Sequence, residues 1–192
     1  MTADNIKIDK DWTLFLDRDG VINEEIPGTY VTSWEDFRFL EGSLEAIAAL
    51  SHIFGKIIIV TNQRGVGRGI MQADDLKRIH HNMQQEIEEK GGRIDKIYAC
   101  TSIHDDDINR KPNTGMALQA KEDFEMIHFK KSVMVGNNIS DMLFGKRVAM
   151  HTVFLCTTNK PVSLPHEVID EQYDSLKEWS ESLTTASIPS LN

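Results

Sequence analysis

The sequence TLFLDRDGVIN, residues 13–23, runs from an apolar stretch directly into two aspartates. Its first four letters are typical of a short strand that is covered on both faces. Aspartate is a poor strand former and is costly to bury without a partner. Asp17 and Asp19 lie two positions apart, so in extended backbone their side chains point to the same side. Carboxylates this close need either a cation between them or a proton on one of them.

Strands and helices alternate along the chain. Continuous apolar runs predict strands at residues 12–17, 56–62, 95–101, 131–137 and 151–156. Apolar residues at helical spacing predict helices at residues 43–55, 74–92, 115–126 and 139–148. This alternation predicts an α/β fold with a Rossmann-like parallel sheet and helices on both faces. Right-handed crossovers would bring the carboxyl ends of the strands to one edge, where ligands bind.

The composition of the chain becomes more polar near residue 160. We predict one domain over residues 1–160 and a C-terminal extension over residues 161–192. The extension should contain one short helix near residues 175–183 and a mobile tail, and should pack in part on the same domain. Between Asp17 and Lys111 there is room for a short flap, helices and loops, so we expect no large cap domain.

Composition limits the partners and the compartment. The 192 residues carry a formal net charge of −9, which argues against a nucleic acid as the main partner. No apolar stretch approaches the roughly 20 residues that a membrane helix needs, and no targeting pattern is visible. The two cysteines, Cys100 and Cys156, fit a reducing compartment. We therefore expect a cytoplasmic protein that works as a monomer and does not bind a membrane.

Polar side chains follow the apolar runs where the strands end. They are carboxylates, amides, a hydroxyl, a lysine and an arginine, at Asp17, Asp19, Thr61, Asn62, Arg110, Lys111, Asn137 and Asp141. A few carboxylates with substrate oxygens suit Mg²⁺, and a carboxylate pair also suits a nucleophile with an acid. A lysine and a hydroxyl aimed at one point can bind phosphoryl oxygens.

Sequence motifs at these positions resemble the haloacid-dehalogenase-like superfamily of phosphatases. The motifs LFLDRDGVIN, IIIVTNQ, RKP and VGNNISD occur in the family's order, and the resemblance covers most of residues 12–157. The stretches TNQRGVGRG and RKPNTGM are similar to the branch that holds the heptose 1,7-bisphosphate, histidinol-phosphate and polynucleotide 3′-phosphatases. The sequence DRDG is closest to the first two of these.

The resemblance implies a Mg²⁺-dependent phosphomonoesterase that acts through an aspartyl-phosphate. Asp17 would be the nucleophile, and Asp19 would protonate the leaving alcohol and later deprotonate the attacking water. Thr61 and Lys111 would hold the phosphoryl group, and Arg110 would contact the substrate beyond it. The substrate would be a small phosphorylated metabolite, either a heptose bisphosphate-like sugar phosphate or histidinol phosphate. A polynucleotide 3′-phosphatase is the alternative enzyme.

The resemblance also implies where Mg²⁺ binds. The metal would rest on the Asp17 carboxylate, the Asp19 backbone carbonyl and Asn137, with Asp141 close by. The family normally has aspartate at the position of Asn137, and an amide brings no negative charge, so we expect weaker metal binding. This departure leaves open a catalytically weakened phosphate-binding or regulatory protein. Further implied substrate contacts are Asn62, Arg64 and Asn138.

Other features depart from the family. Relatives often carry a zinc loop before RKP, but here the segment offers only Cys100 and His104, so we expect no structural zinc. Arg64 stands where a small residue is usual; it could bind a second phosphate or a carboxylate, or it could be an ordinary loop arginine. His80 and His81 lie mid-helix, and we expect them on its polar side with no metal role.

Overall fold

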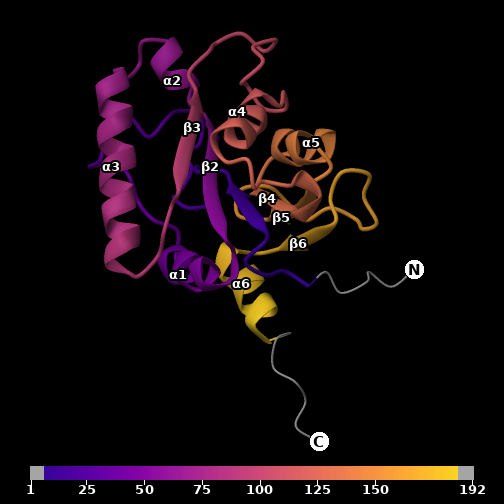
Figure 1. The fold of residues 1–192 in the computed structure, drawn as a ribbon. Helices are drawn as coiled ribbons and strands as arrows, with labels where there is room; N and C mark the ends of the chain where they lie inside the picture. The colour runs from indigo at the N-terminus through magenta and orange to yellow at the C-terminus, as the bar shows by residue number, and fades with distance from the viewer. Residues whose placement is uncertain (1–6, 186–192) are drawn as a thin grey trace, which may run out of the picture.

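The five predicted strands and one further strand form a six-stranded parallel sheet (Figure 1). The computed structural model describes residues 7–185. The strands are β1 (Thr13–Leu16), β2 (Lys56–Asn62), β3 (Lys96–Cys100), β4 (Ser132–Gly136), β5 (His151–Leu155) and β6 (Glu171–Tyr173). The helices are α1 (Ser43–Ile53), α2 (Arg64–Gly67), α3 (Ala73–Glu89), α4 (Gly115–Asp123), α5 (Ile139–Arg147) and α6 (Leu176–Thr185), with a 3₁₀ turn at Phe129–Lys131. The predicted elements are all present, with ends shifted by at most a few residues.

β1 lies in the interior of the sheet, between β2 and β4. The strand order is β3-β2-β1-β4-β5-β6, and all neighbouring strands are parallel. Leu14 of β1 lies opposite Ile57 on one side and Val133 on the other. The chain runs outward from β1 to β3 and then returns to place β4 on the other side of β1. The loops that leave β1 and β4 therefore diverge, and open α/β sheets bind ligands in such a crevice.

Alternating side chains bury both faces of the sheet. Leu14 and Leu16 belong to a core shared with α1, α3 and α6, whereas Phe15 belongs to a second core shared with α4 and α5. Figure 1 shows α1 and α3 on one side of the sheet and α4 and α5 on the other. A strand covered on both sides reads as a continuous apolar run, which is the pattern of β1 and β4. The predicted Rossmann-like sheet with helices on both faces is confirmed.

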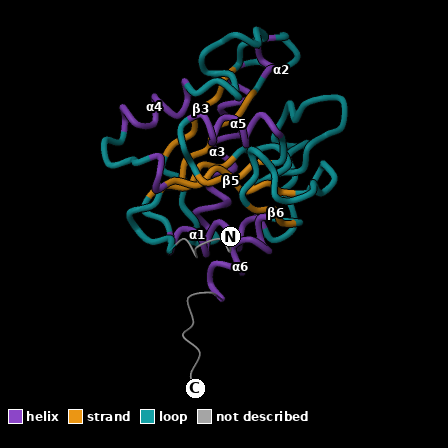
Figure 2. The backbone as a smooth tube through the Cα atoms, turned by 90° about the vertical axis from the view of Figure 1, so that its right-hand side faces the viewer, coloured by secondary structure: helices purple, strands orange, loops and turns teal. Residues whose placement is uncertain are grey.

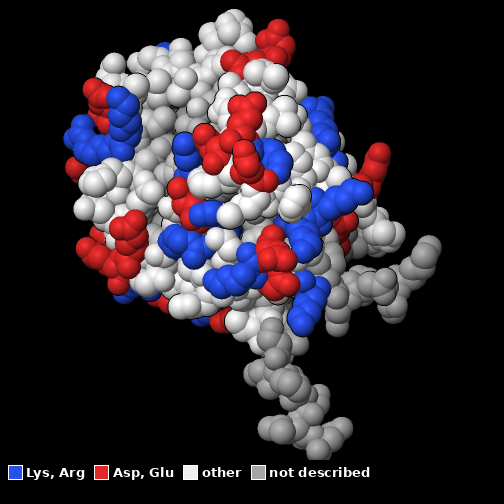
Figure 3. All heavy atoms as spheres, in the orientation of Figure 1, with Lys and Arg blue, Asp and Glu red and all other residues white. Residues whose placement is uncertain are grey.

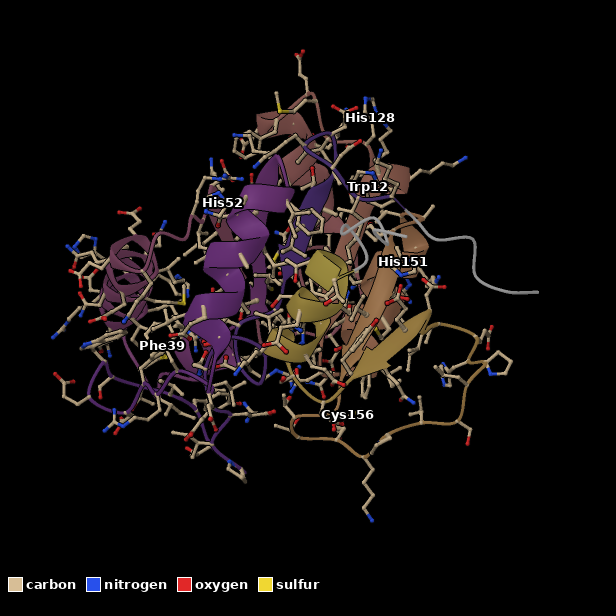
Figure 4. The ribbon with its side chains drawn as sticks, turned by 90° about the horizontal axis from the view of Figure 1, so that it is seen from below. Trp12, Phe39, His52, His128, His151 and Cys156 are labelled. Carbon is tan, nitrogen blue, oxygen red and sulfur yellow. The ribbon has the colours of Figure 1, made fainter. Side chains whose placement is uncertain are left out.

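Residues beyond 160 contribute a strand as well as a helix. β6 pairs with β5, with Val153 opposite Glu171. α6 packs on α1, where the rings of Phe54 and Trp179 lie 6.1 Å apart. Figure 4 shows these two helices side by side in the view from below. The sequence did not indicate β6 because its Glu-Gln-Tyr stretch is short and polar; the predicted tail beyond residue 185 lies outside the described residues.

The connection from β1 to α1 is a loop rather than a domain. Asn23 pairs with Phe39 and closes the loop at its base. Trp34 stacks on Phe37 near its tip, with ring centroids 5.0 Å apart. The connection from β2 to β3 holds only α2 and α3, so residues 7–185 contain no inserted cap domain. Figure 2 shows the loops around α2 gathered at one end of the molecule.

Candidate active site

A polar cavity lies at the carboxyl ends of β1, β2 and β4. Its volume is about 140 Å³. The β1–α1 loop supplies one wall, through Glu25 and Tyr30. Sequence-predicted site residues supply most of its remaining polar lining, namely Asp17, Asp19, Asn62, Lys111, Asn138 and Asp141. The side chains that follow the strands therefore meet at one edge of the sheet, as predicted.

Lys111 lies at the centre of the site between two carboxylates. Its Nζ is 2.9 Å from Asp17 Oδ1 and 2.7 Å from Asp141 Oδ1, and it donates to the Val60 carbonyl at 2.7 Å. Burial raises the pKa of Asp17 to about 7 against the lowering effect of Lys111, and the charges of Asp141 and Asp19 raise the pKa further. The two carboxylates raise the pKa of Lys111 against the effect of its burial. The cluster therefore holds more negative than positive charge, and a further cation would relieve it.

Asn62 holds the backbone that carries Lys111. Its side chain accepts from the Lys111 N–H at 3.0 Å and donates to the Lys111 carbonyl at 3.1 Å. Because Asn62 is the last residue of β2, the sheet itself fixes where the lysine enters the cavity. Asn62 thus positions Lys111, a role more specific than the substrate contact that the sequence suggested.

Asp19 is held by three side chains. Arg18 Nη2 donates to both carboxylate oxygens, at 2.8 and 3.0 Å. Asn23 Nδ2 donates to Oδ1 at 2.9 Å, and Gln63 Nε2 donates to Oδ2 at 2.9 Å. Burial acts to raise the pKa of Asp19, but the charge and hydrogen bonds of Arg18, with those of Asn23 and Gln63, outweigh it and lower the pKa. The carboxyl group is therefore fixed in orientation and held in its ionised form.

Thr61 and Asp19 are linked through Gln63. Gln63 Nε2 donates to Thr61 Oγ1 at 2.8 Å as well as to Asp19. Thr61 and Gln63 are both buried, at 1 % and 2 % exposure. A Thr61 hydroxyl whose oxygen accepts from Gln63 keeps its own hydrogen free to donate to a bound anion.

The fourth motif forms the start of α5. Asn137 is fully buried; its Nδ2 donates to Glu25 at 3.1 Å and to Thr158 at 2.7 Å, and its Oδ1 accepts from Asn138 at 3.1 Å. Asp141 Oδ2 accepts from the Asn138 backbone N–H at 3.0 Å, so it caps the helix. Both oxygens of Asp141 thus have partners within the chain, one on Lys111 and one on α5.

Arg64 and Arg110 converge on one exposed carboxylate. Each donates to Asp105, Arg110 through Nε at 3.1 Å and Arg64 through Nη2. The Asp105 side chain is 85 % exposed. Arg64 Nε and Arg110 Nη1 are buried and have no hydrogen-bond partner among the described residues. The two arginines therefore form a cationic corner whose donors are not all used, and this favours the anion-binding interpretation of Arg64 over an ordinary loop arginine.

The donor set fits one hard cation beside Asp17. No group of three Asp, Glu, His or Cys side chains within residues 7–185 is arranged to hold a metal. Asn137 is not among the residues that line the cavity, and its Oδ1 accepts from Asn138, so the metal ligand role of Asn137 stays a prediction. Burial, which is the largest cause of the raised pKa of Asp17, and the nearby charges of Asp141 and Asp19 disfavour the ionised form of Asp17, and a cation beside it would favour that form. Asp141 is better placed as the partner of Lys111 than as a metal ligand.

Sequence reasoning missed several residues that shape the site. Arg18, Asn23 and Gln63 lie inside the quoted motifs but were given no role, and Glu25 was not singled out within the loop that follows the first strand. The interpretation of His80 as a residue on the polar side of its helix was wrong: its Nε2 lies 3.3 Å from Arg18 Nη1. Burial, with the charge of Arg18, lowers the pKa of His80 to about 3 despite the opposing effect of Asp19.

The sheet, the absence of a cap over residues 7–185 and the Asp17–Lys111–Asp141 cluster define a phosphatase of the haloacid-dehalogenase-like superfamily. Comparison with known families agrees with this class. The chain belongs to the polynucleotide kinase 3 phosphatase family, whose family model matches residues 9–162.

Curated relatives and solved structures narrow the comparison. The chain is 34 % identical over 170 residues to the D-glycero-alpha-D-manno-heptose-1,7-bisphosphate 7-phosphatase of Mycobacterium bovis, covering 88 % of this chain and 90 % of the relative. It is 35 % identical over 167 residues to the D-glycero-beta-D-manno-heptose-1,7-bisphosphate 7-phosphatase of Helicobacter pylori, covering 86 % and 92 %. The crystal structure of D,D-heptose 1.7-bisphosphate phosphatase from B. bronchiseptica, complexed with magnesium and phosphate, matches with a TM-score of 0.82 at 27 % identity, covering 92 % of this chain and 99 % of that chain.

Proposed function

We propose that this phosphatase removes the phosphate at position 7 of D-glycero-D-manno-heptose 1,7-bisphosphate through an aspartyl-phosphate on Asp17. The observation that carries the proposal is the buried Asp17 carboxylate at the end of β1, 2.9 Å from Lys111 and in the same cavity as Asp19. The named activity of the curated relatives supports the substrate. Histidinol phosphate remains the second small-molecule candidate.

The first step transfers the phosphoryl group to the enzyme. Asp17 attacks phosphorus, and the bond from phosphorus to the sugar oxygen breaks with its electron pair on that oxygen. Asp19 is ionised in the free protein, and it gains a proton when the phosphate dianion binds beside it. It donates that proton to the leaving oxygen, so a neutral alcohol leaves. Lys111 and the Thr61 hydroxyl donate to the phosphoryl oxygens and stabilise the charge that spreads over them.

The second step releases phosphate. Asp19 is now ionised, the form that its hydrogen bonds favour, and it takes a proton from water. The water oxygen bonds to phosphorus as the bond to Asp17 breaks, so inorganic phosphate leaves and both carboxyl groups return to their starting states. Mg²⁺, the cofactor, would be held by Asp17, the Asp19 carbonyl and Asn137, and its charge offsets the repulsion between carboxylate and phosphate.

The second phosphate of the substrate fits the corner formed by Arg64 and Arg110. Arg64 Nη2 and Arg110 Nε, which donate to the exposed Asp105, would be available to an anion that displaces it. Bidentate guanidinium groups are the usual partners of phosphate. On the face shown in Figure 3, basic and acidic side chains are interspersed rather than forming one continuous basic band, which favours a small substrate over a polynucleotide.

A substrate panel tests the proposal. Phosphate release with Mg²⁺ should be fastest with one anomer of heptose 1,7-bisphosphate, compared with the other anomer, histidinol phosphate and a 3′-phosphorylated oligonucleotide. Relatives of nearly equal identity are named for the alpha and the beta anomer, so the panel must contain both. Faster turnover of the oligonucleotide would replace the proposal with the polynucleotide alternative.

Asn137→Asp should tighten Mg²⁺ binding by about tenfold, because it adds a full charge to a ligand position. Isothermal titration calorimetry measures the change without any substrate. In the metal-free protein the new carboxylate would face Glu25, which now accepts from the Asn137 amide, so thermal stability should fall until Mg²⁺ is added. Asn138→Asp adds the same charge one position away and should change the affinity less. Equal affinities for both variants would contradict the ligand role of Asn137, and no detectable Mg²⁺ binding by the wild type would favour the regulatory alternative.

We infer that the protein works as a monomer. No helix among residues 7–185 is long and apolar enough to cross a membrane. Cys100 and Cys156 are both free thiols, which supports a reducing, cytoplasmic location.

A further inference from the structure

Arg18 is a buried cation whose donors are directed at two groups. Its side chain is 1 % exposed. Nη2 and Nε donate to the Asp19 carboxylate, at distances from 2.8 to 3.3 Å. Nη1 points away from Asp19 and meets His80 Nε2 at 3.3 Å, its one hydrogen-bond partner within residues 7–185. His80 therefore completes the environment that holds the guanidinium in place.

The direction of the His80 hydrogen bond follows from the chemistry of the two groups. A guanidinium has only donors, so His80 Nε2 must be the acceptor and must carry a lone pair. The imidazole is then neutral, with its proton on Nδ1. His80 lies on α3 beside the buried stripe of Leu76 and Met83, and this packing sets the position of the acceptor. Without it, a buried Nη1 would lose its partner, which is costly for a charged donor.

We propose that His80 is a positioning residue for the acid–base group: it orients Arg18, and Arg18 in turn fixes the Asp19 carboxyl group in the geometry that delivers a proton to the leaving oxygen. This inference rests on the proposed function, since it assigns the proton transfer to Asp19. His80 is not among the residues that line the cavity, and in this role it acts through Arg18 alone.

Substrates with different leaving groups distinguish a positioning role of His80 from a purely structural role. A sugar or other alkyl alkoxide leaves only with a proton, so phosphoryl transfer from an alkyl phosphate depends on a well-placed acid. The 4-nitrophenolate ion leaves without a proton. The ratio kcat/KM reports the steps through the first transfer and excludes the later attack by water, which is common to both substrates. Misplacing Asp19 should therefore lower kcat/KM for alkyl phosphates selectively.

The experiment compares His80→Leu, His80→Gln and wild type. The substrates are the fastest alkyl phosphate of the panel above and 4-nitrophenyl phosphate. General acids contribute roughly 10²–10⁴-fold, so His80→Leu should lower kcat/KM about tenfold for the alkyl phosphate and less than about twofold for the aryl one. His80→Gln should restore most of the loss, because its amide oxygen can accept from Arg18. His81→Leu, the same change on an exposed neighbouring residue, is the matched control and should behave as wild type.

Each possible result either supports or overturns the positioning role of His80. Selective loss with the alkyl phosphate and recovery in His80→Gln support the positioning role. Equal loss with both substrates, or no loss with either, would overturn it while leaving the proposed function intact. A wild-type protein that releases phosphate from none of these substrates would overturn the proposed function, and the role of His80 with it. Circular dichroism and thermal unfolding of each variant show whether a uniform loss comes from misfolding.

Discussion

Asp17→Asn should abolish phosphate release, with kcat falling on the order of 10⁴-fold or more, because an amide cannot form the covalent intermediate. The fold should survive. Burial already raises the pKa of Asp17, which means that the ionised group is held there at a cost in free energy. Lys111 keeps Asp141 as its partner in the variant. The free energy of unfolding of the metal-free protein should therefore stay the same or rise slightly.

Two measurements check this prediction together, namely phosphate release with Mg²⁺ and urea unfolding without it. Asp11→Asn is the matched control, because Asp11 is exposed and precedes β1 at the opposite edge of the sheet. It makes the same chemical change and should leave kcat unaltered. Turnover by Asp17→Asn above a small fraction of the wild-type rate would remove Asp17 from the nucleophile role.

Lys111→Met should cost the protein both activity and stability. The substitution keeps the apolar stem but removes the charge between Asp17 and Asp141, which leaves two buried carboxylates with no cation. Removing one partner of a buried ion pair typically costs about 3–5 kcal/mol. Activity should fall by on the order of 10²–10³-fold, the typical cost of losing one charge-stabilising donor at a reacting centre.

The stability loss in Lys111→Met should respond to metal and to a second substitution. Mg²⁺ can take up part of the unbalanced charge, so the difference in unfolding free energy from wild type should shrink when the metal is present. Adding Asp141→Asn should recover part of the loss, because it removes one of the orphaned carboxylates. Lys131→Met breaks an exposed pair with Asp11 and should change stability by less than about 1 kcal/mol. A Lys111→Met protein as stable as this control would contradict the buried-cluster interpretation.

Much of the fold and part of the site could be predicted from local pattern. Each strand from β1 to β5 is a continuous or nearly continuous apolar run. Each long helix has apolar residues at helical spacing and a recognisable end. The segments that escaped prediction were β6 and α2. β6 is three polar residues that form a strand only because β5 offers an open edge. α2 is a four-residue turn with two glycines, which carries no helical periodicity.

The order of strands and helices along the chain is enough to predict which residues meet at the carboxyl edge of the sheet. Parallel strands joined by right-handed crossovers leave that edge as the meeting place for whatever follows each strand, so Asp17, Thr61 and Asn137 had to converge. How these groups pair with one another depends on the three-dimensional packing of the chain. His80 lies 62 positions from Arg18, and Lys111 lies 49 positions from Asn62. Such contacts depend on the rotation of α3 about its axis and on the path of a loop. A repeating pattern in the sequence specifies neither of these. The contacts in turn determine which groups the charged side chains of the site pair with.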